Sequence, residues 1–206
     1  GKYDLAPEFD AIAQEGVLFL NCYATGERTV QGLEASVASF PPLPGVSIVR
    51  RPETVSGFAT LGHVLAKRGY ATRFYYGGDG LFDQMRGFFQ NNGFDEFIEE
   101  EDFENPVFAN EWGVSDEDLF AKASEDFEKF HAAGKPFFAT LLTASLHSPW
   151  QYPSGRISEL PKNFSVPHGY EYEELNNFRY ADYAIGKFIR DAKQKSYFED
   201  TLFVFV

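Results

Sequence analysis

The sequence predicts an α/β fold, a mostly parallel sheet with helices on both faces. Apolar runs of strand length alternate with segments of helical apolar spacing, and this alternation occurs three times along the chain. The runs are nearly continuously apolar, which is typical of parallel strands that are buried on both faces. At 206 residues the chain is long enough for one sizeable core, so we expect a single domain over residues 1–206.

The first predicted elements lead to a turn that is the most informative stretch of the chain. Pro7 suits the first turn of a helix that ends at Gly16. The apolar run at residues 17–23 predicts a buried strand, in which Cys22 would be an inert buried thiol. After a turn containing Gly26, a helix is expected over about residues 29–39.

The alternation continues to the last residue. A helix over residues 60–68 precedes a strand at 71–76, which ends in a glycine-rich turn. The remaining expected elements are a helix from the N-cap Ser115 to Gly134, a strand at 137–143, a helix at about 172–193 and a strand at 201–206. Because the last run is apolar up to Val206, we expect this chain to be a piece of a larger protein.

Composition excludes several classes of protein. The net charge of −13 argues against a nucleic-acid surface, which needs clustered Lys and Arg. A single cysteine excludes an internal disulfide framework and a cysteine-rich zinc site. No apolar run approaches the roughly 18 residues of a membrane span.

Three polar side chains are expected at the carboxyl ends of strands. A helix that opens at Thr29, next to Arg28, would direct free N–H groups and about half a positive charge at a bound phosphate or sulfate. Thr29 is the candidate nucleophile, although threonine at this place is also a common N-cap. Asp79 follows the second strand and His147 the third, and α/β sheets usually build their sites at these ends.

Four stretches together resemble a known family. They are LAPEFDAIAQEGVLFLNCYATGERT, YGGDGLFDQMRGFFQNNGFDEF, TASLHSPW and FRYADYAIGKFIRDAKQKSYFEDTLFVFV. They resemble the sulfatase-fold branch of the alkaline phosphatase superfamily, and within it the lipoteichoic-acid-synthase-like phosphoglycerol transferases. The resemblance runs through nearly the whole chain.

The resemblance implies a reaction and roles for individual residues. Thr29 would be the nucleophile and a ligand of a divalent cation, Mn²⁺ or Mg²⁺, and would form a phosphothreonine intermediate. Arg28 and His147 would contact the phosphate. Asp79 and Asp83, in the segment 77–83, would line the head-group pocket. The substrate would be a phospholipid head group or another phosphodiester.

Departures from the family pattern limit what can be carried over. The positions of the family's substrate-binding histidine, tryptophan and arginine fall on Tyr76, Asp83 and Met85. Because methionine cannot replace an arginine clamp on phosphate, Asp83 is expected to favour a head group with an amine or several hydroxyls. The family's other metal ligands have no counterpart in the chain. We therefore expect an incomplete domain, lacking its first core strand and its C-terminal part, that binds no metal and is inactive alone.

Other functions stay open at this point. A phosphodiesterase could use the same threonine, and a degenerate domain could bind a head group without catalysis. A true sulfatase is disfavoured because Gln31 and Leu33 stand where its formylglycine motif has Pro and Arg. A nucleotide-binding domain is disfavoured because no G-x-G-x-x-G follows a strand. The resemblance implies a bacterial protein anchored by helices upstream of Gly1 and facing the periplasm or cell surface.

Overall fold

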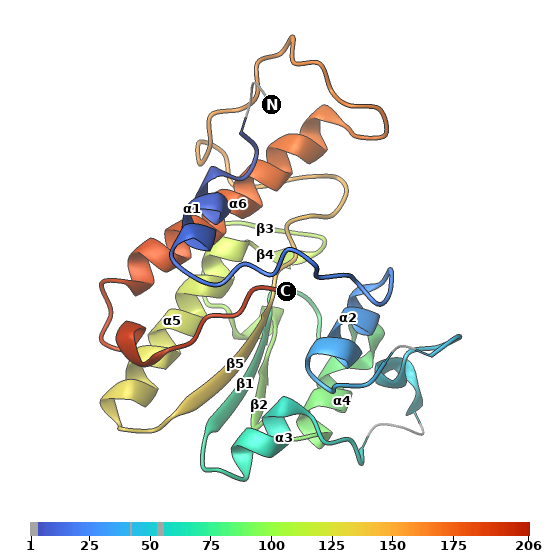
Figure 1. Ribbon diagram of the computed structural model, residues 1–206, viewed down its shortest axis with the longest axis vertical. Coiled ribbons are helices and arrows are strands. Elements are labelled where there is room, and N and C mark those ends of the chain that lie inside the picture. The colour runs from blue at the N-terminus through green and yellow to red at the C-terminus, as the bar shows by residue number, and fades with distance from the viewer. Residues whose placement is uncertain (1–3, 42, 53–55) are drawn as a thin grey trace.

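A three-stranded parallel sheet lies at the centre of the protein, in the strand order β2–β1–β5 (Figure 1). The computed structural model describes residues 4–41, 43–52 and 56–206. The strands of this sheet are β1 (Ala71–Tyr76), β2 (Glu96–Ile98) and β5 (Phe137–Leu142). The register pairs Phe74 of β1 with Phe97 of β2 and with Thr140 of β5.

Helices cover both faces of this sheet, which confirms the predicted fold class (Figure 1). On one face lie α2 (Thr29–Ser36), α3 (Leu61–Ala66) and α4 (Met85–Asn91), and on the other lie α5 (Asp116–Ala132), α6 (Tyr172–Ala192) and α1 (Pro7–Gln14). Short 3₁₀ helices are η1 (Ile48–Arg50), η3 (Phe82–Gln84), η4 (Glu100–Asp102) and η5 (Phe198–Asp200).

The central strand β1 sends alternate side chains into two cores. Phe74 is fully buried and stacks on Phe89 of α4 and Phe97 of β2, with ring centroids 4.4 and 4.8 Å away. Its neighbour Tyr75 points to the opposite face, where its hydroxyl donates to the Asp126 carboxylate of α5 at 3.1 Å. Burial of each such ring contributes about 1.5–3 kcal/mol, so this strand fixes the middle of the fold.

Side-chain acceptors fix the starts of α5 and α1. The Ser115 hydroxyl accepts the backbone N–H of Asp118 at 3.2 Å, and α5 starts at the next residue. The Asp182 carboxylate of α6 accepts the backbone N–H groups of Glu8 and Phe9 at 3.0 and 2.8 Å. These donors at the start of α1 would otherwise be unsatisfied, so the contact attaches α1 to α6.

The expected strand at residues 17–23 does not form. Val17, Leu18, Phe19 and Leu20 are 55–84 % exposed, and Cys22 is exposed instead of buried. A strand needs backbone partners as well as apolar side chains, and none of the strands in the described ranges pairs with this segment.

The expected strand at residues 201–206 is likewise wrong. Leu202 and Val204 are 87 % and 72 % exposed, whereas Phe203 packs against Phe188 and Phe198 with centroids 5.9 and 5.5 Å away. The Phe203 side chain therefore contacts α6 and the 3₁₀ turn η5, and the segment has no hydrogen-bonded ladder in the described structure.

A two-stranded hairpin, which the sequence did not predict, stands at the carboxyl ends of the central strands. It consists of β3 (Ala109–Asn110) and β4 (Gly113–Val114). The Val114 backbone N–H donates to the Gly77 carbonyl at 2.9 Å, so the hairpin is fastened to the turn after β1.

Candidate active site

The start of α2 leaves the Thr29 hydroxyl exposed. Thr29 is the first residue of the helix and not its N-cap, which is Arg28. The Gln31 Oε1 accepts the backbone N–H groups of Glu27 and Arg28, just before the helix, at 3.0 and 3.2 Å. Both Thr29 and Arg28 are exposed. The interpretation of Thr29 as a mere N-cap is therefore wrong, because Thr29 is the first helical residue and the N-cap is Arg28.

The turn after β1 needs glycine because its neighbours leave no room for a side chain. A Cβ on Gly78 would lie 2.6 Å from the Trp112 carbonyl oxygen and 2.8 Å from the Tyr76 hydroxyl oxygen. A Cβ on Gly80 would lie 2.8 Å from a carboxylate oxygen of Glu99, which accepts the Gly80 N–H at 2.8 Å. Close packing therefore fixes the path of this turn.

Asp79 in this turn and Asp83 in the following η3 have different surroundings. Asp79 is exposed, and its carboxylate accepts the backbone N–H of Leu81 at 2.8 Å. Asp83 is mostly buried and lies 2.9 Å from the Nε of Arg50. Met85, two residues later, is 1 % exposed and belongs to the core.

Tyr76 lies beside these acids at the end of β1. It is 6 % exposed, and burial raises the pKa of its hydroxyl, with further increases from the charges of Asp79, Asp83 and Glu100. The hydroxyl is therefore protonated at neutral pH and is available as a hydrogen-bond donor.

The loop after β5 presents His147 against an aromatic wall. The His147 imidazole lies against the Trp112 ring with centroids 4.3 Å apart, and its Nδ1 lies 3.0 Å from the Ala144 carbonyl oxygen. The Trp112 indole donates to the Ser148 carbonyl at 2.7 Å. The hairpin residue Trp112 thus connects the turn after β1 with the loop after β5.

Asp116 holds the start of the same loop. Its side-chain Oδ1 accepts the backbone N–H groups of Ala144 and Ser145 at 3.1 and 3.3 Å. The residue is 2 % exposed, and burial raises the pKa of its carboxyl, while hydrogen bonds from Ser145 and Ala144 oppose the increase.

The expected site residues all lie at the carboxyl end of the sheet. Figure 1 shows the start of α2 at the same end as the loops that follow β1 and β5. Val30, next to Thr29, shares one buried cluster with Tyr76 and Ala144. Asp83 contacts Arg50 instead of facing solvent as a lone carboxylate.

The sequence profile of the sulfatase family matches residues 1–206. The chain belongs to the sulfatase family. Among solved structures, this sulfatase-family chain is similar to a protein of the alkaline phosphatase superfamily from Vibrio parahaemolyticus. The two share 44% sequence identity and superpose with a TM-score of 0.86, and the match covers 96% of this chain and 47% of that one. The lipoteichoic acid synthase LtaP from Listeria monocytogenes shares the fold, with 20% identity and a TM-score of 0.79 over 93% of this chain and 47% of that one.

A curated relative of this sulfatase-family chain is phosphoglycerol transferase I of Escherichia coli. The two are 26% identical over 214 residues, which is 98% of this chain and 27% of the relative. The chain thus spans about a quarter of that relative and about half of the two solved structures. These matches confirm the resemblance to the alkaline phosphatase superfamily and to its phosphoglycerol transferases.

The described residues of this sulfatase-family chain do not by themselves fit a metal ion. In the described ranges no group of three His, Cys, Asp or Glu side chains is arranged to hold one. Mn²⁺ and Mg²⁺ need several oxygen or nitrogen ligands, so Thr29 alone is insufficient.

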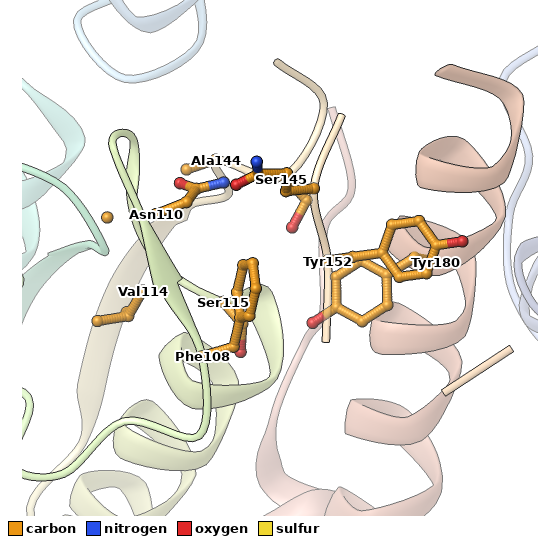
Figure 2. A pocket seen from close by; sticks show the side chains of 10 residues that line it. Phe108, Asn110, Val114, Ser115, Ala144, Ser145, Tyr152 and Tyr180 are labelled. Carbon is orange, nitrogen blue, oxygen red and sulfur yellow. The ribbon is translucent and has the colours of Figure 1, made fainter. Parts of the chain in front are cut away.

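One cavity near the strand ends is too small for a substrate. Figure 2 shows this cavity, of about 10 Å³, behind the loop after β5, between Asn110, Ser145, Tyr152 and Tyr180. This volume admits about one water molecule. A larger cavity of about 390 Å³ lies between α5 and α6, over Phe120, and does not adjoin the strand ends.

Sequence reasoning missed the residues that support the site. Arg50, Trp112 and Asp116 contact site residues that are remote in sequence, and no local pattern marks such pairs. Glu99 stands in a run of four acidic residues, 99–102, a pattern typical of a solvated surface, yet it pairs with Arg86 and accepts the Gly80 N–H.

Proposed function

We propose that the complete protein transfers a phosphoryl-type group, phosphoglycerol or a related head group, through a phosphothreonine intermediate on Thr29. The observation that carries the proposal is the start of α2. Thr29 is exposed there beside Arg28, and Gln31 fixes the backbone just before the helix by accepting the N–H groups of Glu27 and Arg28. The free donors and the partial positive charge of a helix start favour a phosphate next to this hydroxyl.

The proposed reaction has two balanced steps. Thr29 Oγ1 attacks phosphorus, the bond from phosphorus to the donor alcohol breaks, and the proton of Thr29 leaves with that alcohol. An acceptor alcohol or water then attacks the phosphothreonine and returns a proton to Thr29. Arg28 and His147 would bind the phosphate oxygens, and charge-assisted hydrogen bonds of this kind are stronger than neutral ones.

We propose that the residues missing from the site lie outside this chain. The chain spans 47% of each of the two solved structures, and the described residues do not form a metal site. A divalent cation, Mn²⁺ or Mg²⁺, would then be held by Thr29 together with residues beyond this chain. On this proposal the 206 residues are one part of a catalytic domain and are inactive alone.

The proposed substrate is a phospholipid head group or another phosphodiester at the extracytoplasmic face of a bacterial membrane. Two similar proteins support this substrate, because one is a phosphoglycerol transferase and the other a lipoteichoic acid synthase. Across the described ranges, no helix is both long enough and apolar enough to cross a membrane.

The test is turnover of bis(p-nitrophenyl) phosphate with Mn²⁺ or Mg²⁺ by the complete protein. Thr29→Ala should abolish it, whereas Thr25→Ala, a matched change at another exposed threonine of the preceding segment, should leave it within about twofold. The 206-residue chain alone should be inactive. Activity that survives Thr29→Ala would refute the nucleophile.

Two other functions are separated by the same assay. A phosphodiesterase would release only the hydrolysed monoester when glycerol is added, whereas a transferase would form the glycerol diester. A degenerate domain would bind a head group without turnover in any variant.

A further inference from the structure

One peptide group links the buried carboxylate of Asp116 to the imidazole of His147. This peptide joins Ala144 to Ser145 at the start of the loop after β5, and Figure 2 labels both residues. Its N–H, which is that of Ser145, donates to Asp116 Oδ1 at 3.3 Å. Its carbonyl oxygen, which is that of Ala144, lies 3.0 Å from His147 Nδ1. Carboxylate, peptide and imidazole therefore form one hydrogen-bonded chain.

The direction of this chain fixes which ring nitrogen of His147 carries hydrogen. A carbonyl oxygen can only accept, so Nδ1 has to be the donor in its contact with Ala144. The other nitrogen, Nε2, is then the one that remains for a ligand. In the neutral ring Nε2 accepts from a hydroxyl, and in the protonated ring it donates to a phosphate oxygen.

The Asp116 carboxylate strengthens this arrangement by polarising the peptide. A peptide whose N–H donates to an anion has a better carbonyl acceptor, because hydrogen bonds in a chain polarise one another, most of all in a buried, low-dielectric place. Asp116 is 2% exposed, and its Oδ1 also accepts the N–H of Ala144 at 3.1 Å. Burial raises the pKa of this carboxyl, and the charge of a protonated His147 acts in the opposite direction. One oxygen thus holds two successive peptides and keeps the Ala144 carbonyl turned to the imidazole.

The other contacts of His147 hold the ring without selecting its tautomer. The Trp112 ring lies against the imidazole, with centroids 4.3 Å apart. The backbone N–H of His147 donates to the Ser145 carbonyl at 2.9 Å, and its carbonyl accepts the Trp150 N–H at 2.8 Å. Ring contact and backbone hydrogen bonds do not distinguish Nδ1 from Nε2. The tautomer therefore depends on the Ala144 carbonyl and on the acid that holds it.

We propose that Asp116 is a positioning residue that acts through the Ala144–Ser145 peptide to hold His147 with hydrogen on Nδ1 and with Nε2 free for the ligand. The identity of that ligand, a phosphate group or a substrate hydroxyl, rests on the proposed phosphoryl transfer. A carboxylate or a backbone carbonyl often sets the tautomer of a histidine by direct contact. Here the two are combined in series, so an acid that touches no reacting atom determines what His147 offers.

The test is the ¹⁵N spectrum of the complete protein with labelled histidine, at about pH 8.5, where an ordinary imidazole is neutral. Protonated and unprotonated ring nitrogens have clearly different chemical shifts, and His147→Gln identifies the signals. Wild type should carry hydrogen on Nδ1. Asp116→Ala should lower the ratio of the Nδ1–H to the Nε2–H tautomer about 5-fold, whereas Asp116→Asn, which keeps an acceptor oxygen, should leave it within about twofold.

Asp182→Ala is the matched control. The Asp182 carboxylate is also buried and also accepts two backbone N–H groups, those of Glu8 and Phe9, but it attaches α1 to α6. Its loss should leave the His147 tautomer unchanged. Hydrogen on Nε2 in the wild type would overturn the proposal without any variant. An unchanged ratio in Asp116→Ala, or an equal change in Asp182→Ala, would overturn it as well.

The spectrum needs no turnover, so it separates this inference from the proposed function. If the transfer reaction also holds, kcat for bis(p-nitrophenyl) phosphate should fall about 10-fold in Asp116→Ala and less in Asp116→Asn. The expected tautomer changes in a protein that never turns over a phosphodiester would retain Asp116 as the positioning residue and refute the transfer reaction.

Discussion

Asp116 should determine the geometry of the loop that carries His147. Its Oδ1 accepts two backbone N–H groups, from Ala144 and Ser145, at the point where β5 ends. Asp116→Ala removes the acceptor of both donors. Asp116→Asn keeps an oxygen at the same place, so the two variants separate the hydrogen bonds from the charge.

The cost of Asp116→Ala follows from the burial of the donors. The N–H of Ala144 is buried, and a buried donor without a partner costs about 1–3 kcal/mol. The N–H of Ser145 is partly buried and can reach water, so its loss costs about 0.5–1.5 kcal/mol. The free energy of unfolding should therefore fall by about 3 kcal/mol in Asp116→Ala and by less than about 1 kcal/mol in Asp116→Asn.

Urea unfolding at pH 7 measures this difference. With a slope of about 2 kcal/mol per molar urea, the Asp116→Ala midpoint should fall by about 1.5 M. Asp191→Asn changes an exposed, ion-paired acid on α6 and should shift stability by no more than about 0.5 kcal/mol. Equal midpoints for the Ala and Asn variants would refute the reasoning, because the loss would then come from the charge and not from the acceptor.

The pH dependence gives an independent check on the same carboxyl. Burial raises the Asp116 pKa above its ordinary value, so the folded state binds this proton more strongly than the unfolded state. Stability from this group is thus present below the ordinary Asp pKa of about 3.9 and is lost as the pH rises through the folded pKa. Wild type should therefore lose stability relative to Asp116→Asn as the pH rises from about 4.

Three further changes test other parts of the structure. Trp112→Ala removes the ring on which His147 lies and should lower kcat/KM of the complete protein by about 2–10-fold; an unchanged value would contradict this positioning. Gly78→Ala places a Cβ 2.6 Å from a carbonyl oxygen and should cost about 1–3 kcal/mol in urea unfolding, whereas a neutral effect would contradict the close approach. Burial raises the pKa of the Tyr75 and Tyr180 hydroxyls, so the free energy of unfolding should fall above about pH 10. This fall should be smaller in Tyr75→Phe and Tyr180→Phe, and parallel alkaline unfolding profiles for wild type and variants would contradict it.

The sequence predicted those elements whose signals are local. The strand at residues 71–76 and the helix after Ser115 are flanked by glycine or a capping side chain, and both were placed correctly. The runs at 17–23 and 201–206 are equally apolar but form no strand, because apolar composition does not reveal whether a backbone partner is present. The strand β2, with three residues, is too short to produce a period.

For the candidate site, the sequence predicted only the local positions of single residues, and no strand precedes Thr29 in the described structure. Thr29, Asp79 and His147 each follow a local signal, a helix start or the end of an apolar run. The contacts of Arg50 with Asp83 and of Trp112 with His147 join segments that are remote in sequence, so they depend on the tertiary fold. The ion pair of Asp83 with Arg50 accordingly was not part of the sequence prediction.

The most direct test of the central proposal is the mass of Thr29 during turnover. The complete protein would be mixed with bis(p-nitrophenyl) phosphate and a divalent cation, quenched in acid, digested and examined by mass spectrometry. We predict a nitrophenylphosphoryl group on the peptide that contains Thr29, and no such group in Thr29→Ala. Turnover with that peptide unmodified, or with the group on another residue, would contradict a nucleophilic Thr29.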